Sequence, residues 1–233
     1  MLNQRPTIRA LLILSVTLIL GTQYFRINAQ EGRAQISEDV RVIETYPFAD
    51  PNAVPILVSD DRLYPYHRFE GYAHNSEAVE WRVIHLENEW IELWVLPEAG
   101  GKVWGARVKE TGHEFIYRNE VMKFRNIALR GPWTSGGIEF NFGVIGHTPS
   151  TATPVDYRMR EHDDGSVSVV VGAMDLPSRT HWRVEVRLPA DRAYFETNVL
   201  WWNPTTLEQP YYNWMTAAAF AQDDLVMSIP GNS

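Results

Sequence analysis

From Trp81 onward, apolar and polar side chains alternate over short runs, and turn residues interrupt the runs about every ten positions. Ile91, Leu93 and Val95 form one such run, which Pro97–Gly101 ends. Period-two alternation is the pattern of a strand with two different faces, and turn signals at this spacing are typical of a β-sandwich. The sequence therefore predicts an all-β fold, an antiparallel β-sandwich. The best helical candidate, Ala217–Ala221, is short and fits a strand better.

The clearest hairpin is predicted over residues 181–203. Its first strand places charged side chains on one face and four apolar side chains on the other, namely Trp182, Val184, Val186 and Leu188. Pro189–Arg192 then turns the chain into the second strand. Further strands are predicted around the turns Glu110–Gly112 and Asp163–Gly165, at residues 103–108, 114–118, 157–162 and 166–173.

The N-terminus has the three parts of a secretory signal peptide. Arg5 and Arg9 precede an apolar run at residues 10–21, and the segment ends at the small residue Ala29. The run is too short for a membrane-spanning helix, which needs about 20 apolar residues. We therefore expect residues 1–29 to be a signal peptide cleaved after Ala29, which leaves a secreted or periplasmic protein with no stable membrane span.

The mature chain is expected to be acidic and free of cysteine. Without residues 1–29 it has 18 basic and 29 acidic side chains, a net charge of −11. Such a charge disfavours nucleic acid and anionic membranes as partners. Without disulfides, an ordinary core must hold the fold. Nine Trp, ten Tyr and nine Phe supply its large side chains, and the same rings can stack on sugars.

The two ends of the mature chain differ from its middle. Residues 30–61 are polar and contain Pro47, Pro51 and Pro55, which predicts an irregular leader with one short edge strand at residues 54–58. The sandwich domain is assigned to residues 62–233. Its last apolar segment, Tyr211–Phe220, lies close to Ser233, and apolar edge strands need covering. We therefore expect this copy of the domain to be truncated at its C-terminus.

The segment 130–157 is unusually rich in glycine, aromatic and polar residues. Glycine in strands and loops permits close approach of the backbone to a ligand. Glu139 alternates with Ile138 and Phe140, so a strand places its carboxylate on the opposite face from these apolar residues, together with Asn141. This pattern predicts a carboxylate standing in a cleft.

The run Gly136–Phe142, followed by His147 and Thr153–Tyr157, resembles a large bacterial family of domains of unknown function in the galactose mutarotase-like β-supersandwich superfamily. Many members carry tetratricopeptide repeats after the sandwich. Supporting matches are Leu96–Gly101, Phe115–Asn119 and Tyr212–Ala217, so the resemblance covers about residues 81–230. Members of the family usually continue through further strands, which is the main departure of this chain.

The resemblance implies that the chain binds a carbohydrate on a concave sheet face. It implies acid and base chemistry by Glu139, His147 and Asp156, as in a glycoside hydrolase or an aldose 1-epimerase-like isomerase. The side chains expected to bind the sugar are those of Arg130, Trp133, Asn141 and Tyr157.

Other interpretations of these residues stay open. Glu139 can be an ion-pair partner of Arg130, and Asp156 can cap a turn. The domain can be a non-catalytic carbohydrate-binding module that stacks a sugar on Trp133, or a scaffold for protein contacts. The histidines lack the spacing of a metal site and no glycine-rich phosphate loop opens a helix, so no metal or other cofactor is predicted.

Overall fold

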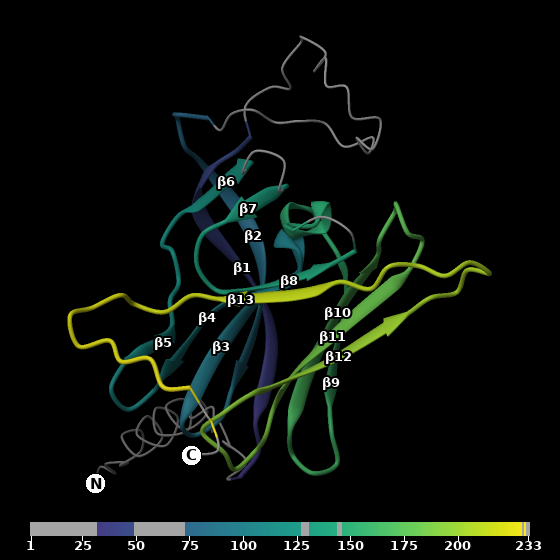
Figure 1. Cartoon of the computed structure of the whole chain (residues 1–233). Coiled ribbons are helices and arrows are strands. Elements are labelled where there is room, and N and C mark those ends of the chain that lie inside the picture. The colour runs from purple at the N-terminus through teal and green to yellow at the C-terminus, as the bar shows by residue number, and fades with distance from the viewer. Residues whose placement is uncertain (1–31, 49–72, 127–130, 144–145, 230, 232–233) are drawn as a thin grey trace, which may run out of the picture. The chain divides into compact units, whose positions relative to one another are not determined.

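The computed structural model describes residues 32–48, 73–126, 131–143, 146–229 and 231. These residues form strands and two short 3₁₀ turns, arranged as two sheets in a sandwich-like fold (Figure 1). The strands pair antiparallel, except for a short parallel pairing of residues 45–46 with residues 122–123. The predicted all-β class is therefore confirmed. Among the described residues no helix is long and apolar enough to cross a membrane. The predicted signal peptide and the edge strand at residues 54–58 lie outside the described residues.

The larger sheet has nine strands in the order β13-β8-β4-β3-β2-β1-β6-β7, with β5 paired to β4. Their bounds are β1 Gln35–Tyr46, β2 Glu77–Glu87, β3 Ile91–Leu96, β4 Lys102–Val108, β5 Glu114–Ile116, β6 Met122–Asn126, β7 Pro132–Thr134, β8 Ile138–Phe142 and β13 Asn213–Ala217. The 3₁₀ turn η1, Pro97–Ala99, joins β3 to β4, and η3, Pro149–Ala152, follows β8.

The smaller sheet has four strands in the order β12-β11-β10-β9. They are β9 Asp156–Glu161, β10 Val167–Met174, β11 His181–Leu188 and β12 Glu196–Trp202. The predicted hairpin is confirmed, because β11 pairs with β12 from His181↔Trp202 to Arg187↔Glu196. The four apolar side chains of β11 are all buried, as the alternation predicts.

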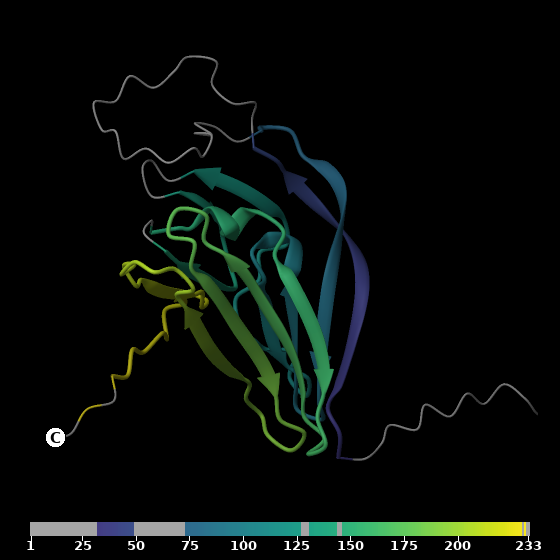
Figure 2. The ribbon, with the colours of Figure 1, turned by 90° about the vertical axis from the view of Figure 1, so that its right-hand side faces the viewer.

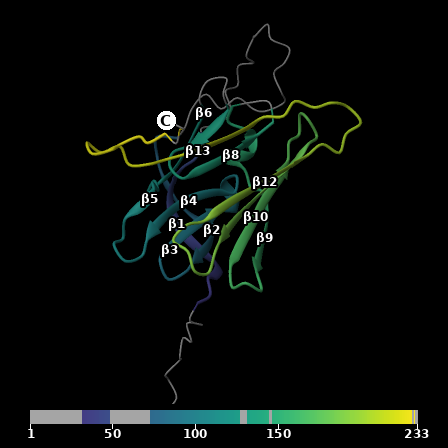
Figure 3. The same ribbon diagram turned by 60° about the horizontal axis from the view of Figure 1, so that its bottom comes forward.

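The main core lies between the two sheets, which are seen one beside the other in Figures 1 and 3. From the larger sheet, β8 contributes Phe140 and Phe142, and from the smaller sheet β11 contributes Trp182. The rings of Phe142 and Trp182 stack with their centroids 5.0 Å apart. Burial of such large rings is the main force that holds two sheets together in the absence of disulfides.

The prediction that residues 30–61 are irregular is wrong for residues 35–46, which form β1. This strand pairs with β2 from Gln35↔Glu87 to Thr45↔Glu77 and also contacts β6 (Figure 2). Its alternation is weak because most of its side chains are exposed, Val40 and Val42 included. The backbone ladder to β2 therefore stabilises β1 more than side-chain burial does, and the prolines that suggested irregular structure all follow the strand.

The face of the larger sheet that is turned away from the main core carries a second apolar cluster. It includes Trp81, Trp94 and Trp104, from β2, β3 and β4. Charged side chains lie among these rings, among them Glu92 of β3 and the buried Lys102 of β4. A sheet face that mixes buried aromatic and ionisable side chains is unusual for a plain structural surface, because buried charges are costly unless they are paired.

Candidate functional site

Strand β8 holds the site because its two faces have different surroundings. Ile138, Phe140 and Phe142 point into the main core, which leaves Glu139 and Asn141 on the opposite face. Both polar side chains are nevertheless buried, with Glu139 only 3% exposed. The structure thus confirms the face that the alternation predicted for Glu139, and it adds that the carboxylate is almost completely removed from solvent.

Glu139 and His147 form a buried acid–base pair. Oε2 of Glu139 lies 2.8 Å from Nδ1 of His147, and it also accepts a hydrogen bond of 3.1 Å from Nδ2 of Asn141. Thr216 of β13 donates a further bond of 3.3 Å to the same oxygen. Oε1, the other carboxylate oxygen, is buried without a hydrogen-bond partner in the described part of the chain.

Asn141 fixes the loop that carries His147. Its Oδ1 accepts hydrogen bonds from the backbone N–H of Thr148 and from the hydroxyl of Thr151, at 3.0 and 3.1 Å. Its Nδ2 donates to Glu139, so the amide is bonded on both sides. Asn141 therefore positions both members of the pair, a role different from the predicted direct contact with a sugar.

Two tryptophans enclose the His147 ring. The ring centroid of Trp214, on β13, lies 4.9 Å from that of His147, and the ring centroid of Trp133, on β7, lies 6.4 Å from it. Together with Glu139 and Thr216 these rings line a cavity of about 370 Å³. A larger hollow of about 480 Å³ near Trp90 contains no histidine or lysine, so the acid–base chemistry is concentrated in the smaller cavity.

Lys102 is a buried neighbour of Glu139 and was not among the predicted site residues. Its Nζ donates a hydrogen bond of 2.7 Å to the hydroxyl of Thr134. Complete burial lowers the pKa of Lys102 to about 8, although the neighbouring Glu139 carboxylate opposes this shift by stabilising the ammonium. A lysine with such a pKa can exchange a proton near neutral pH, which makes it a third ionisable group of the site.

We expect the stability of the protein to rise between pH 8 and 10.5 because of Lys102. Its pKa is lower in the folded chain than the ordinary 10.5, so in this range the unfolded chain binds more protons and folding is favoured as pH rises. The gain is about 3 kcal/mol. Chemical denaturation of the wild type and of Lys102→Met at several pH values in this range measures how much the free energy of unfolding rises with pH in each protein. Lys109→Met, a variant of an exposed lysine, is the matched control. An equal pH dependence for the wild type and Lys102→Met would contradict the expectation.

The structure does not bring Asp156 and Tyr157 to this site. Both lie on β9 of the smaller sheet, where Asp156 is exposed. The hydroxyl of Tyr157 donates to Glu38 at 2.8 Å, and the guanidinium of Arg82 lies over its ring. The grouping of these two residues with Glu139 is therefore not supported, because the loop before β9 carries the chain from one sheet to the other. Arg130 lies outside the described residues.

Trp214 and Thr216 complete the site, although sequence analysis did not select them. β13 pairs antiparallel with β8 and places Trp214 opposite Asn141 and Thr216 opposite Glu139. Their spacing by two residues shows that they share one face, but only the pairing of β13 with β8 identifies that face. Lys102 had a detectable signal, since it is a charged residue directly after two glycines and at the start of the mostly apolar run Val103–Ala106.

The described residues contain no group of three or more His, Cys, Asp or Glu side chains suited to a metal ion. What the cavity offers is a carboxylate and an imidazole beside two indole rings, and the buried amine of Lys102 is a neighbour of the carboxylate. This combination can bind a flat or ring-shaped polar molecule and exchange protons with it.

Fold and site thus define a domain with two β-sheets and a buried acid–base pair in an aromatic-walled cavity on the larger sheet. The chain belongs to the family described as domain of unknown function DUF5107, whose sequence profile matches residues 59–233. It is also similar to a TPR-domain containing protein from Parabacteroides distasonis, with 27% sequence identity and a TM-score of 0.73. The similarity covers 82% of this chain and 33% of the other, so this chain spans about a third of that protein.

Proposed function

We propose that this domain binds a carbohydrate in the cavity between Trp133 and Trp214, and that Glu139 and His147 act on the sugar as an acid–base pair. The buried hydrogen bond between Glu139 and His147, at 2.8 Å in the wall of this cavity, carries the proposal. The resemblance to galactose mutarotase-like domains supports it, because those domains bind sugars on a concave sheet face. The predicted export of the chain is consistent with a glycan ligand.

The aromatic walls suit the apolar faces of sugar rings. A pyranose presents C–H groups on its faces and hydroxyl groups at its edge, so it stacks on an indole and offers its edge to polar groups. Trp133 and Trp214 supply the indoles, and Thr216 lies beside them in the wall of the same cavity.

The pair has the arrangement of a carboxylate-oriented general base. If Nδ1 of His147 donates to Glu139, the other ring nitrogen is free to take a proton from a sugar hydroxyl, and the carboxylate stabilises the imidazolium that forms. Opening of a sugar ring also needs an acid that protonates the ring oxygen. The protonated imidazole can return its proton in that step, so one pair serves both proton transfers of a mutarotation.

Substitution of Trp133 tests the binding part of the proposal. We expect Trp133→Ala to weaken glycan binding by about thirtyfold or more, because truncation of a central aromatic anchor costs at least about 2 kcal/mol. A glycan array identifies the ligand, and calorimetric titration measures the loss. Trp90→Ala, a tryptophan outside the cavity, is the matched control. Equal affinity of wild type and Trp133→Ala for the array ligand would refute the assignment of the cavity.

A second candidate function, a scaffold for protein contacts, has one observation in its favour. Among the described strands β12 pairs only with β11, and it exposes large apolar side chains, with Leu200 57% and Trp202 58% exposed. Exposed apolar patches of this kind mark protein interfaces. This function predicts that the folded protein gives no signal on a glycan array, whereas a hit abolished by Trp133→Ala would contradict it.

A further inference from the structure

Three arginines converge on the ring of Trp94, on the face of the larger sheet that carries the second apolar cluster. The guanidinium carbons of Arg41, Arg107 and Arg118 lie 5.3, 5.4 and 4.6 Å from the ring centroid of Trp94. We call these three residues the arginine cluster. They come from β1, from β4 and from the segment after β5, so three separate parts of the chain bring positive charge to one place.

The arginine cluster lies on the sheet face that carries Glu139. Arg118 also stacks over Trp104, at 5.0 Å, and Trp104 shares its face of β4 with Lys102, two residues before it. Lys102 is the neighbour of Glu139. A continuous row of aromatic and charged side chains therefore connects the arginine cluster to the cavity.

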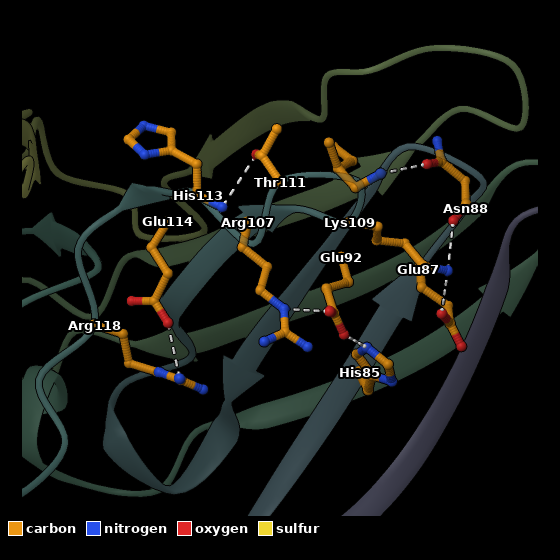
Figure 4. A network of polar contacts seen from close by, with 11 residues as sticks. His85, Glu87, Asn88, Glu92, Arg107, Lys109, Thr111, His113, Glu114 and Arg118 are labelled. Atoms are coloured by element: carbon orange, nitrogen blue, oxygen red, sulfur yellow. Dashed lines mark hydrogen bonds and ion pairs between the residues drawn. The ribbon is translucent and has the colours of Figure 1, made fainter.

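Two of the three arginines have carboxylate partners. Figure 4 shows Arg107 directed at Glu92, which also bonds His85, and Arg118 directed at Glu114. The Arg118–Glu114 ion pair is 2.8 Å long, and both side chains remain partly exposed. Glu92 is largely buried, while 42% of the Arg107 side chain stays accessible. Ion pairing therefore neutralises two charges of the cluster without covering its guanidinium groups.

Arg41 is the member of the arginine cluster that has no ion pair in the described part of the chain. In the described part of the chain, no carboxylate oxygen lies within ion-pair distance of its guanidinium group, which stacks on Trp94 instead. Partial burial lowers the pKa of Arg41, and the charge of Arg118 lowers it further, against the opposing influence of Asp39 and Glu92. Arg41 is thus held beside like charges, an arrangement that an added anion would stabilise.

Trp94 adds an unused hydrogen-bond donor at the centre of the cluster. Its Nε1 is buried and has no partner among the described residues, and its ring is only 2% exposed. Indole N–H groups that are buried usually find an acceptor. The centre of the arginine cluster therefore combines a guanidinium group that has no ion-pair partner in the described part of the chain with a buried donor that has no acceptor there, and an anion beside the cluster would compensate the former.

We propose that the arginine cluster binds the anionic group of an acidic sugar, a uronate carboxylate or a sulfate ester, on the same glycan that occupies the cavity. Arginine suits this task because its planar fork of N–H donors matches the oxygens of a carboxylate or sulfate. The net negative charge of the chain disfavours anionic ligands in general, so a local group of arginines is needed to hold one. The identity of the ligand as a sugar rests on the proposed function.

Titration with matched acidic and neutral glycans tests the proposal. The probes are oligogalacturonate, a sulfated oligogalactoside and the neutral oligogalactoside, each measured by calorimetry with the full chain. We expect at least one acidic probe to bind about tenfold or more tightly than the neutral one, and the preference to shrink as salt is added. The two acidic probes distinguish a carboxylate site from a sulfate site.

Arg41→Gln removes the charge that has no ion-pair partner among the described residues and keeps most of the side-chain length. It is expected to weaken the acidic probe about tenfold and to leave the neutral probe unchanged, because a hydrogen bond to a charged group contributes about 1.5–3 kcal/mol. Arg160→Gln, an exposed arginine on β9 of the other sheet, is the matched control and is expected to change neither affinity.

The outcomes separate this inference from the proposed function. Equal binding of acidic and neutral probes, lost together in Trp133→Ala, would overturn the role of the arginine cluster and support the cavity. Acidic binding that depends on Arg41 but not on Trp133 would support the arginine cluster and overturn the cavity. Absence of binding by all three probes to the folded protein overturns the inference.

Discussion

Glu139→Gln is expected to reduce turnover of the glycan ligand by about 10²–10⁴-fold, the range that a positioned acid–base group contributes. The glutamine keeps the shape and the contacts to Asn141 and Thr216, but it does not stabilise a charged His147 ring. Binding is expected to persist, because Trp133 and Trp214 are unchanged. Turnover is measured on the glycan identified by the array, either as release of reducing ends or as the rate of anomer exchange.

Substitution of His147, the hydrogen-bonded partner of Glu139, gives a second test of the catalytic assignment. His147→Gln is expected to lose about as much turnover as Glu139→Gln, and the double variant is expected to lose little more than either, because the two groups act as a unit. Glu161→Gln, an exposed glutamate of β9, is the matched control. Unchanged turnover in Glu139→Gln with intact thermal stability would refute the catalytic assignment and leave a binding module.

Gly137→Ala is expected to destabilise the fold by about 3 kcal/mol or more. Gly137 has a φ of +73°, a conformation that costs an alanine roughly 1–2 kcal/mol. A Cβ at this position would also lie 2.1 Å from the carbonyl oxygen of Val103 and 3.0 Å from Cε of Lys102. The backbone of β4 cannot yield to such a contact without moving Lys102, so the site is expected to be disturbed together with the fold.

Gly112→Ala provides a matched control for the clash. Gly112 has nearly the same φ, +71°, but nothing lies within 4 Å of its added Cβ. Chemical denaturation of the two variants therefore separates backbone strain, which both suffer, from the collision with β4, which only Gly137→Ala suffers. An equal loss of stability in the two variants would contradict the close packing of β8 against β4.

Much of the fold is predictable because side-chain alternation is a local property. Residues 181–203 show this best, since Trp182, Val184 and Val186 identify both the strand and its buried face. β1 shows the limit. Its exposed Val40 and Val42 give no clear alternation, and the eleven paired residues of β2 that stabilise it are distant in sequence. A strand held by its backbone ladder leaves little trace in its own side chains.

Part of the candidate site is equally predictable. Alternation places Glu139 opposite Ile138 and Phe140, and the nearby His147 is the natural partner for a carboxylate on that face. The pairing of the two residues at 2.8 Å agrees with this interpretation. Asp156 and Tyr157 illustrate the opposite case. Their proximity in sequence to Glu139 and His147 suggested a shared site, but the chain crosses to the other sheet before β9 and so separates them from that site.

The sequence by itself determined the all-β class, the hairpin of β11 and β12 and the face on which Glu139 stands, because each depends on the period of two along one strand. The tertiary structure alone decided that Lys102, Trp214 and Thr216 join Glu139 and His147, and that three arginines meet over Trp94. These groupings depend on which strands become neighbours and in what register. Strand order is set by packing across the whole sheet, and no local pattern of residues encodes it.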